Sequence, residues 1–190
     1  DIMLIGDAQS APRDSATADW RQSMEMPPRW QPGAAIDWIR ATPELSMIDR
    51  WLPAGLCFLG HVADRAAGLL PADTNGVAAG ASIEDAAVRA FVELVERDAV
   101  AIWWYNRLPR PRLDPADLGE PLVAAYGAWS GERGRPLVLY DLSHDCDVRV
   151  VAAMSHDAQG GHIALGFGAG AATAEAARHA VGELAQFDCN

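Results

Sequence analysis

The sequence predicts an α+β fold, mixed in its order of strands and helices, and three observations support this class. The predicted elements follow one another as strands, helix, helix, strands and helix. Two of the helices stand behind similar Gly-Ala segments, which indicates a repeated strand–helix unit. Half of the 190 residues are apolar and 22% are charged, so the chain can bury one sizeable core.

The first part of the chain begins with a segment of little periodicity. Residues 1–35 contain four prolines, and we expect irregular structure there. The stretches AIDWIRAT (35–42) and WLPAGLCFLG (51–60) predict two short strands around a turn at Pro43. We therefore predict an irregular segment over 1–35 and a folded domain over 36–190.

The second part of the chain carries most of the predicted regular structure. A long helix is predicted from the N-cap residue Ser82 to about Asn106, where the prolines of LPRPRLDP end it. A shorter helix is predicted around residues 115–130. Three strands follow, the third running into a Gly-rich turn, and then a last helix. These four elements span residues 135–143, 148–156, 162–171 and about 173–188.

Two helical segments repeat each other at a spacing of 90 residues. GASIEDAAVRAFVELVERD (80–98) lies over GAATAEAARHAVGELAQFD (170–188). Alanine-rich helices match one another readily, so the polar positions carry the evidence. The polar matches are Glu93 with Glu183, Glu96 with Gln186 and Asp98 with Asp188. We interpret these matches as a true structural repeat.

Each repeated helix carries a polar stripe along one face, because helical geometry turns about 100° per residue. The stripe of the first helix consists of Arg89, Glu93, Glu96 and Arg97, and that of the second of His179, Glu183 and Gln186. The other faces of the first helix are largely apolar, which predicts that this helix is buried. Its stripe would then face a partner, a metal ion or a polar cleft, since unpaired buried charge is costly.

Two interpretations of the stripes remain open. The i,i+4 pairs Arg89–Glu93 and Glu93–Arg97 could be salt bridges on a solvated face, worth roughly 0.2–0.5 kcal/mol each. Matched carboxylates and an amide on two helices could instead form a cage of hard oxygen ligands. Such a cage suits Mg²⁺, which proteins usually hold with a few carboxylates and substrate phosphates. The repeat favours the cage.

Composition excludes several classes of partner and mechanism. The formal net charge is −11, which argues against binding to nucleic acid or to an acidic membrane surface. All fifteen basic residues are arginines, so no lysine Schiff base or Walker-type lysine is available. Three widely spaced cysteines, no signal peptide and no run of eighteen apolar residues predict a reduced, cytoplasmic location with no membrane span.

Two further candidate sites are less specific. His144, His156 and His162 lie among turns and Asp residues and could form a zinc site. The stretch GFGAG at 166–170 could be a phosphate-cradling loop before a helix, although a single Gly-rich turn is not diagnostic.

The region around the first stripe resembles a known family. TNGVAAGASIEDAAVRAFVELVERDAVAIWWYNR (74–107) resembles the middle signature of the YcaO family, which is Ser-Asn-Gly, a small-residue loop and a helix with Glu-x-x-Glu-Arg. Residues 161–186 are similar to a later family segment that ends in Arg-x-x-x-Glu-x-x-Gln. The resemblance runs from about residue 36 to 188 and is most specific in the first signature.

This resemblance implies ATP-dependent activation of peptide backbone amides in ribosomally made precursor peptides. A neighbouring side chain or an external sulfide adds to the amide carbon, the resulting oxygen is phosphorylated, and phosphate leaves to give an azoline or a thioamide. The implied fold has repeated strand–helix units and a mixed sheet, with helices that present ligands to a central ATP cleft. Implied partners are a leader-binding or a sulfur-handling protein, and a homodimer remains open.

The resemblance also assigns ligands, although it assigns no catalytic residue. Mg²⁺ would be bound by Glu93, Glu96 and Glu183. ATP would be bound by Asn75, Asp85, Arg89, Arg97, His179 and Gln186.

The chain departs from the family pattern at several points. His179 stands where the family has arginine, with Arg178 one position away, and Thr74 replaces the family serine. An earlier Ser-x-x-x-Glu-x-x-Glu-Arg segment and a proline-rich C-terminal tail are not found, so 36–190 is predicted to be a partial domain. The chain is then a fragment of an enzyme or a degenerate relative. A non-catalytic docking protein and a plain structural repeat are the rival interpretations.

Overall fold

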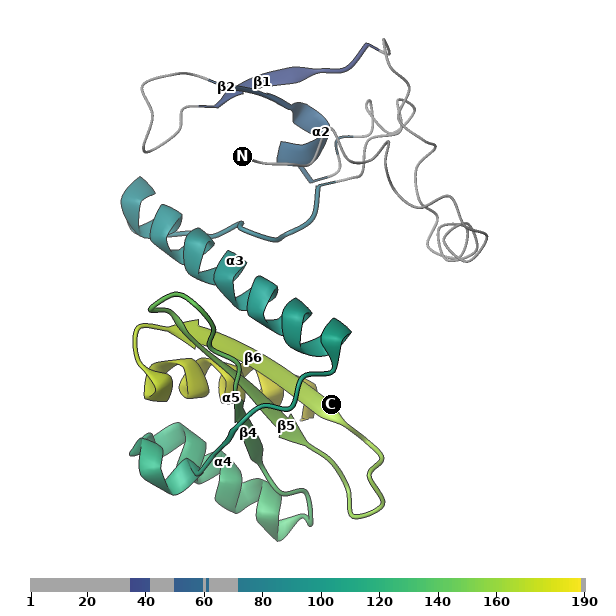
Figure 1. Cartoon of the computed structure of the whole chain (residues 1–190), viewed down its shortest axis with the longest axis vertical. Helices are drawn as coiled ribbons and strands as arrows, with labels where there is room; N and C mark the ends of the chain where they lie inside the picture. Colours follow the sequence, from purple (N-terminus) through teal and green to yellow (C-terminus); the bar gives the residue numbers. More distant parts are fainter. Residues whose placement is uncertain (1–34, 42–49, 60, 62–71, 189–190) are drawn as a thin grey trace. The chain divides into compact units, whose positions relative to one another are not determined.

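The computed structural model describes residues 35–41, 50–59, 61 and 72–188 (Figure 1). The chain divides into two compact units, Asp1–Thr74 and Asn75–Asn190. The predicted irregular segment 1–35 and the predicted turn at Pro43 lie outside the described residues, apart from residue 35.

The described part of the first unit contains a pair of antiparallel strands and one helical turn. Strand β1 (Trp38–Ala41) pairs antiparallel with β2 (Arg50–Pro53), which confirms the two predicted strands in part. The prediction of a strand through residue 60 is wrong, because α2 (Ala54–Cys57) follows directly. Pro53 ends the ladder, since it has no N–H to donate, and the Ala54 N–H bonds the Asp37 carbonyl at 2.8 Å.

The second unit begins with the long helix α3 (Ile83–Asn106) and agrees with the predicted bounds. Ser82 is its N-cap, and its hydroxyl accepts a hydrogen bond from the Asp85 N–H at 3.2 Å. Arg107 ends the helix in the left-handed conformation, with φ 52°.

A four-stranded sheet forms the centre of the second unit. Its strands lie in the order β3 (Arg112–Leu113), β4 (Val138–Asp141), β5 (Arg149–Ser155) and β6 (Ala164–Gly170). Helices with strands confirm the predicted α+β class, and the three predicted strands are present as β4 to β6. All pairings between the described strands are antiparallel, where a mixed sheet was expected, because each strand turns back on its neighbour through a short connection or through α4.

The region between α3 and β4 differs from the prediction in two ways. Strand β3 is not predicted by the sequence, because its two residues stand between prolines, which favour the end of a helix over a strand. The predicted helix over 115–130 is divided into the 3₁₀ turn η3 (Pro115–Leu118) and α4 (Pro121–Glu132). Gly119, with φ 62°, separates them.

Helices cover both faces of this sheet (Figure 1). On one face α3 packs through Val92, Val95 and Trp103 against β5 and β6. On the other face lie α4 and α5 (Thr173–Asp188), and the latter matches the predicted last helix. The core on that side is formed by Val123, Leu139, Val151, Ala153, Ala177, Ala180, Val181 and Leu184, among others.

The two helices of the repeat begin at equivalent positions. Helix α3 starts at Ile83 and α5 starts at Thr173, which is 90 residues later. The Ala81 N–H donates to the Asp85 carboxylate at 2.9 Å, and the equivalent Ala171 N–H donates to Glu175 at the same distance. Equivalent caps at equivalent residues support the repeat that the sequence predicts.

Helix α3 is less buried than its composition predicts. Only Ala99 is fully buried, whereas Phe91 and Leu94 are 57% and 48% exposed. Their equivalents in α5, Val181 and Leu184, are completely buried. The prediction of a buried α3 is therefore wrong for the part of the chain that the structure describes, because the sheet contacts only one face of the helix.

Candidate functional site: an acidic cluster at the edge of the sheet

Strand β6 is the edge of the described sheet, and its outer backbone groups bind side chains in place of a further strand. The Phe167 N–H donates to a carboxylate oxygen of Glu183 at 2.5 Å. The Ala169 carbonyl accepts a hydrogen bond from His179 Nδ1 at 2.9 Å. Glu96, on α3, also approaches the backbone of Ala169, which acts to lower the pKa of Glu96 against the larger effect of burial. Side chains from both repeated helices therefore meet along one strand edge.

The glycines of β6 allow α5 to lie directly against the strand. A Cβ atom on Gly166 would be 2.2 Å from the Ala180 carbonyl oxygen, and one on Gly168 would be 2.3 Å from the Ala176 carbonyl oxygen. The suggestion that GFGAG is a phosphate-cradling loop is therefore wrong. These residues are strand, and the glycines permit the close approach of a helix that carries Glu183.

Glu93 is held from two sides at the start of the second unit. Its Oε1 accepts a hydrogen bond from Arg97 Nε at 2.8 Å, and its Oε2 accepts one from the Gly76 N–H. Glu183 likewise accepts a backbone N–H from the segment that precedes its own helix. The two glutamates that align in the repeat thus have similar environments.

We call Glu93, Glu96 and Glu183 the acidic cluster. Glu96, on α3, interacts electrostatically with both of the other carboxylates. Burial raises the pKa of Glu96 to about 7; Arg97 opposes this shift, and the negative charges of Glu183 and Glu93 add to it. Glu183 is on α5 and the other residues are on α3. The tertiary structure therefore brings carboxylates of both stripes close enough to interact electrostatically. A cation would relieve the repulsion among these carboxylates.

A comparison with protein families shows which family the chain belongs to. The model of the family described as YcaO cyclodehydratase, ATP- and Mg²⁺-binding, matches residues 8–189. The chain belongs to the YcaO family.

Several relatives and structures of known fold support this membership. A protein of the tfuA 3′ region of Rhizobium leguminosarum bv. trifolii is 28% identical over 162 residues, which are 80% of this chain and 38% of that protein. A heterocyclase in complex with substrate and cofactor has a TM-score of 0.82 and 31% identity, over 91% of this chain and 25% of that one. YcaO from Methanopyrus kandleri, bound with AMPPCP and Mg²⁺, has a TM-score of 0.70 and 27% identity, over 85% and 43%. The chain thus spans less than half the length of these relatives.

The residues expected to bind Mg²⁺ fit that ion in chemistry but are not arranged as a finished site. Their donors are carboxylate oxygens, which hard divalent cations prefer. Among the described residues, however, no three side chains of His, Cys, Asp or Glu are grouped so that they could hold one ion. This applies equally to the suggested zinc site at His144, His156 and His162. In this YcaO chain the Glu93 carboxylate accepts hydrogen bonds from Arg97 and from the Gly76 N–H, so these contacts must change before it can bind a cation.

The remaining predicted ATP ligands differ in their contacts. Asp85 and Arg89 form an ion pair with each other, at 2.9 Å between Arg89 Nε and the carboxylate. Asn75 is exposed beside Gly76, and Gln186 is exposed near the end of α5. Arg97 is bound to Glu93 within the cluster, and this hydrogen bond raises the pKa of Arg97.

Sequence reasoning missed the backbone contribution to the site. Gly76, Phe167 and Ala169 each bind a stripe residue through main-chain atoms. The Asn-Gly pair at 75–76 could have indicated the first of these, because such pairs mark positive φ. No local signal identifies the other two, since they depend on which strand lies at the sheet edge.

Gly76→Ala is expected to lower the free energy of unfolding by about 1–2 kcal/mol. Gly76 has φ +73°, a conformation that alanine adopts at a cost, and its Cβ would lie 3.0 Å from Leu94 Cγ. Urea unfolding measures the effect. Gly119→Ala is the matched control, since Gly119 also has positive φ but no heavy atom within 4 Å of the new Cβ. An equal loss in the two variants would show that Leu94 contributes nothing.

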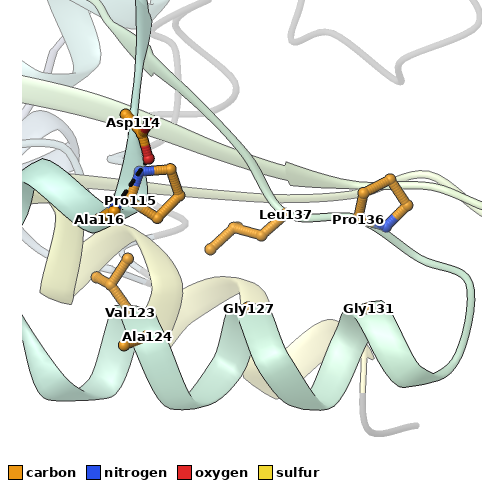
Figure 2. A pocket seen from close by; sticks show the side chains of 9 residues that line it. All are labelled: Asp114, Pro115, Ala116, Val123, Ala124, Gly127, Gly131, Pro136 and Leu137. Atoms are coloured by element: carbon orange, nitrogen blue, oxygen red, sulfur yellow. Dashed lines mark hydrogen bonds between the residues drawn. The ribbon is translucent and has the colours of Figure 1, made fainter.

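A pocket on the α4 side of the sheet holds none of the predicted site residues (Figure 2). It has a volume of about 430 Å³ and is lined by Asp114, Pro115, Ala116, Val123, Ala124, Gly127, Gly131, Pro136 and Leu137. The Asp114 carboxylate accepts the Ala116 N–H at 2.9 Å and so caps η3. Its lining offers no other ionisable group, so we place the site at the acidic cluster.

Within the described residues, no helix combines the length and the apolar character needed to cross a bilayer.

Proposed function

We propose that this chain forms part of an ATP- and Mg²⁺-dependent cyclodehydratase that activates backbone amides of a ribosomally made precursor peptide. The observation that carries the proposal is the cluster of Glu93, Glu96 and Glu183, in which carboxylates from both repeated helices share one field. The heterocyclases among the similar structures favour an azoline product. Thioamide formation is the alternative product of the same activation.

In this proposal the acidic cluster holds the metal ions and Arg97 acts beside them. Bound Mg²⁺ neutralises the phosphate charge and so assists transfer to the amide oxygen. Glu93, Glu96 and Glu183 supply oxygen ligands, and Arg97, released from Glu93, donates to phosphate oxygens. Asn75, Asp85, Arg89 and Gln186 surround the nucleotide, while the peptide and a leader-binding or sulfur-handling partner bind elsewhere on the complete protein.

Glu93→Gln is expected to weaken binding of ATP with Mg²⁺ at least tenfold. The amide keeps the size of the side chain but removes the charge that the metal requires. Its NH₂ group only donates, so it faces one of the two present N–H donors without accepting from it. Isothermal titration calorimetry with ATP and Mg²⁺, on the complete protein to which this chain is proposed to belong, measures the effect.

Asp98→Asn is the control for this experiment, because Asp98 is an exposed carboxylate on the same helix outside the stripe. Its affinity should match that of the unmodified chain. Equal affinity for Glu93→Gln would contradict the metal role and favour a plain structural repeat. A complete YcaO protein that binds peptide but gives no heat with ATP and Mg²⁺ would instead be a docking protein.

A further inference from the structure

The neighbouring residues Arg178 and His179 of α5 form a hydrogen-bonded relay to the edge of β6. His179 Nδ1 lies 2.9 Å from the Ala169 carbonyl oxygen, and Arg178 Nη2 lies 2.9 Å from His179 Nε2. A carbonyl oxygen only accepts, so Nδ1 carries the proton. A guanidinium only donates, so Nε2 presents its lone pair. With both bonds made, His179 is a neutral imidazole in one defined tautomer.

This arrangement leaves the positive charge on Arg178. Within the described residues, Arg178 makes no ion pair with a carboxylate, and its hydrogen bond is to a neutral ring. One of its five N–H donors is used by His179, and none of the other four has a partner among the described residues, so they can serve a ligand. The guanidinium is exposed but anchored, which lowers the entropy cost of binding an anion.

The internal repeat allows the charge of Arg178 to be compared with that of Arg89 in the first copy. His179 aligns with Arg89, whose guanidinium is neutralised by Asp85 at 2.9 Å. The residue that aligns with Asp85 is Glu175, and its carboxylate accepts the Ala171 N–H. The second copy therefore keeps a cation beside its stripe without the carboxylate partner that the first copy has.

We propose that Arg178 binds phosphate oxygens of the nucleotide and that His179 is its positioning residue, which makes no contact with the nucleotide. This inference rests on the proposed function of the acidic cluster. His179 lies one turn before Glu183 on the same stripe, and its bond to Ala169 is two residues along β6 from the Phe167 N–H that binds Glu183. The relay therefore holds the guanidinium on the part of α5 that carries this carboxylate. Arginine binds phosphate with paired donors, a geometry that the imidazole of His179 lacks.

The test measures binding of ATP with Mg²⁺, by calorimetry, to the complete protein to which this chain is proposed to belong. Arg178→Gln is expected to weaken binding about tenfold, because it removes the charge and most of the donors. His179→Ala is expected to cause a smaller loss, since Arg178 remains but is no longer anchored. His179→Gln, which keeps an acceptor near the Nε2 position, should recover most of that loss. Arg133→Gln, an exposed arginine at the end of α4, is the control and should leave the affinity unchanged.

A second measurement does not depend on the nucleotide. Nitrogen-15 chemical shifts of the His179 ring should report a protonated Nδ1 and an unprotonated Nε2, and Arg178→Gln should change the Nε2 shift. A protonated Nε2 in the unmodified chain would overturn the relay.

The two proposals fail in different ways. If the complete unmodified protein binds no ATP with Mg²⁺, the proposed function falls and this inference falls with it. If the complete unmodified protein binds and its Arg178→Gln variant binds equally well, the inference alone is overturned. A larger loss for His179→Ala than for Arg178→Gln would also overturn it, because His179 would then be the ligand.

Discussion

Gly166→Ala is expected to lower the free energy of unfolding by about 3 kcal/mol or more. The new Cβ would lie 2.2 Å from the Ala180 carbonyl oxygen and 2.3 Å from the Leu184 nitrogen. Both atoms belong to the backbone of α5, so no side-chain rotation removes the clash, and the helix must move away from the sheet. Urea unfolding followed by circular dichroism measures the loss.

The same substitution should also affect the site. Glu183 reaches the Phe167 N–H only because α5 lies against β6, so a displaced helix withdraws one carboxylate from the cluster. Gly182→Ala is the matched control on α5, since no heavy atom lies within 4 Å of its new Cβ. This variant should be stabilised by roughly 0.5–1 kcal/mol through helix propensity. Similar losses in both variants would refute the close-approach explanation.

Glu96→Gln is expected to stabilise the chain at pH 8 by about 2 kcal/mol and to leave it nearly unchanged at pH 4. The pKa of Glu96 is raised to about 7, chiefly by burial and then by the neighbouring carboxylates. The folded state therefore holds this proton more tightly than the unfolded state does. Below the ordinary pKa of glutamate both states are protonated, and the stabilisation that the proton provides is complete.

That stabilisation is lost as the pH rises through the folded-state pKa of about 7. The amide introduced by Glu96→Gln imitates the protonated group at every pH, so the difference between the two chains should open between about pH 5 and 8. The expected stabilisation is smaller than the full pKa shift implies, because Glu96 is partly exposed to solvent.

Urea unfolding across this pH range checks the prediction. Glu132→Gln, an exposed glutamate on α4, should differ from the unmodified chain by less than about 0.5 kcal/mol. A pH-independent difference for Glu96→Gln would contradict a shared field among Glu93, Glu96 and Glu183. The stabilised variant should nevertheless bind ATP with Mg²⁺ less well, because a neutral amide is a poorer metal ligand.

Local signals in the sequence were sufficient for the helices that carry the site. Ser82 and the prolines after Asn106 predicted both ends of α3 correctly, because caps and helix breakers act within one turn. The alignment of Glu93 with Glu183 also placed two equivalent carboxylates on equivalent helices, since helical periodicity fixes which residues share a face.

Other features could not be predicted from local patterns. The exposed face of α3 has the same apolar character as the buried face of α5, and only the position of the sheet distinguishes Leu94 from Leu184. Strand β3 exists because β4 provides a partner for two residues that have little strand propensity of their own. The stretch GFGAG is strand for the same reason, although its glycines suggested a turn.

Residue spacing alone shows that two similar helices present carboxylates on matched faces, and the motifs indicate the YcaO family. Packing on the sheet brings both faces to the edge that β6 forms in the described residues, where Glu96 approaches Glu183 and where His179 binds Ala169 and Arg178. Helix faces follow from residue spacing, which is local. The unpaired groups of an edge strand follow from the order of strands in the sheet, which is set by contacts far apart in the chain.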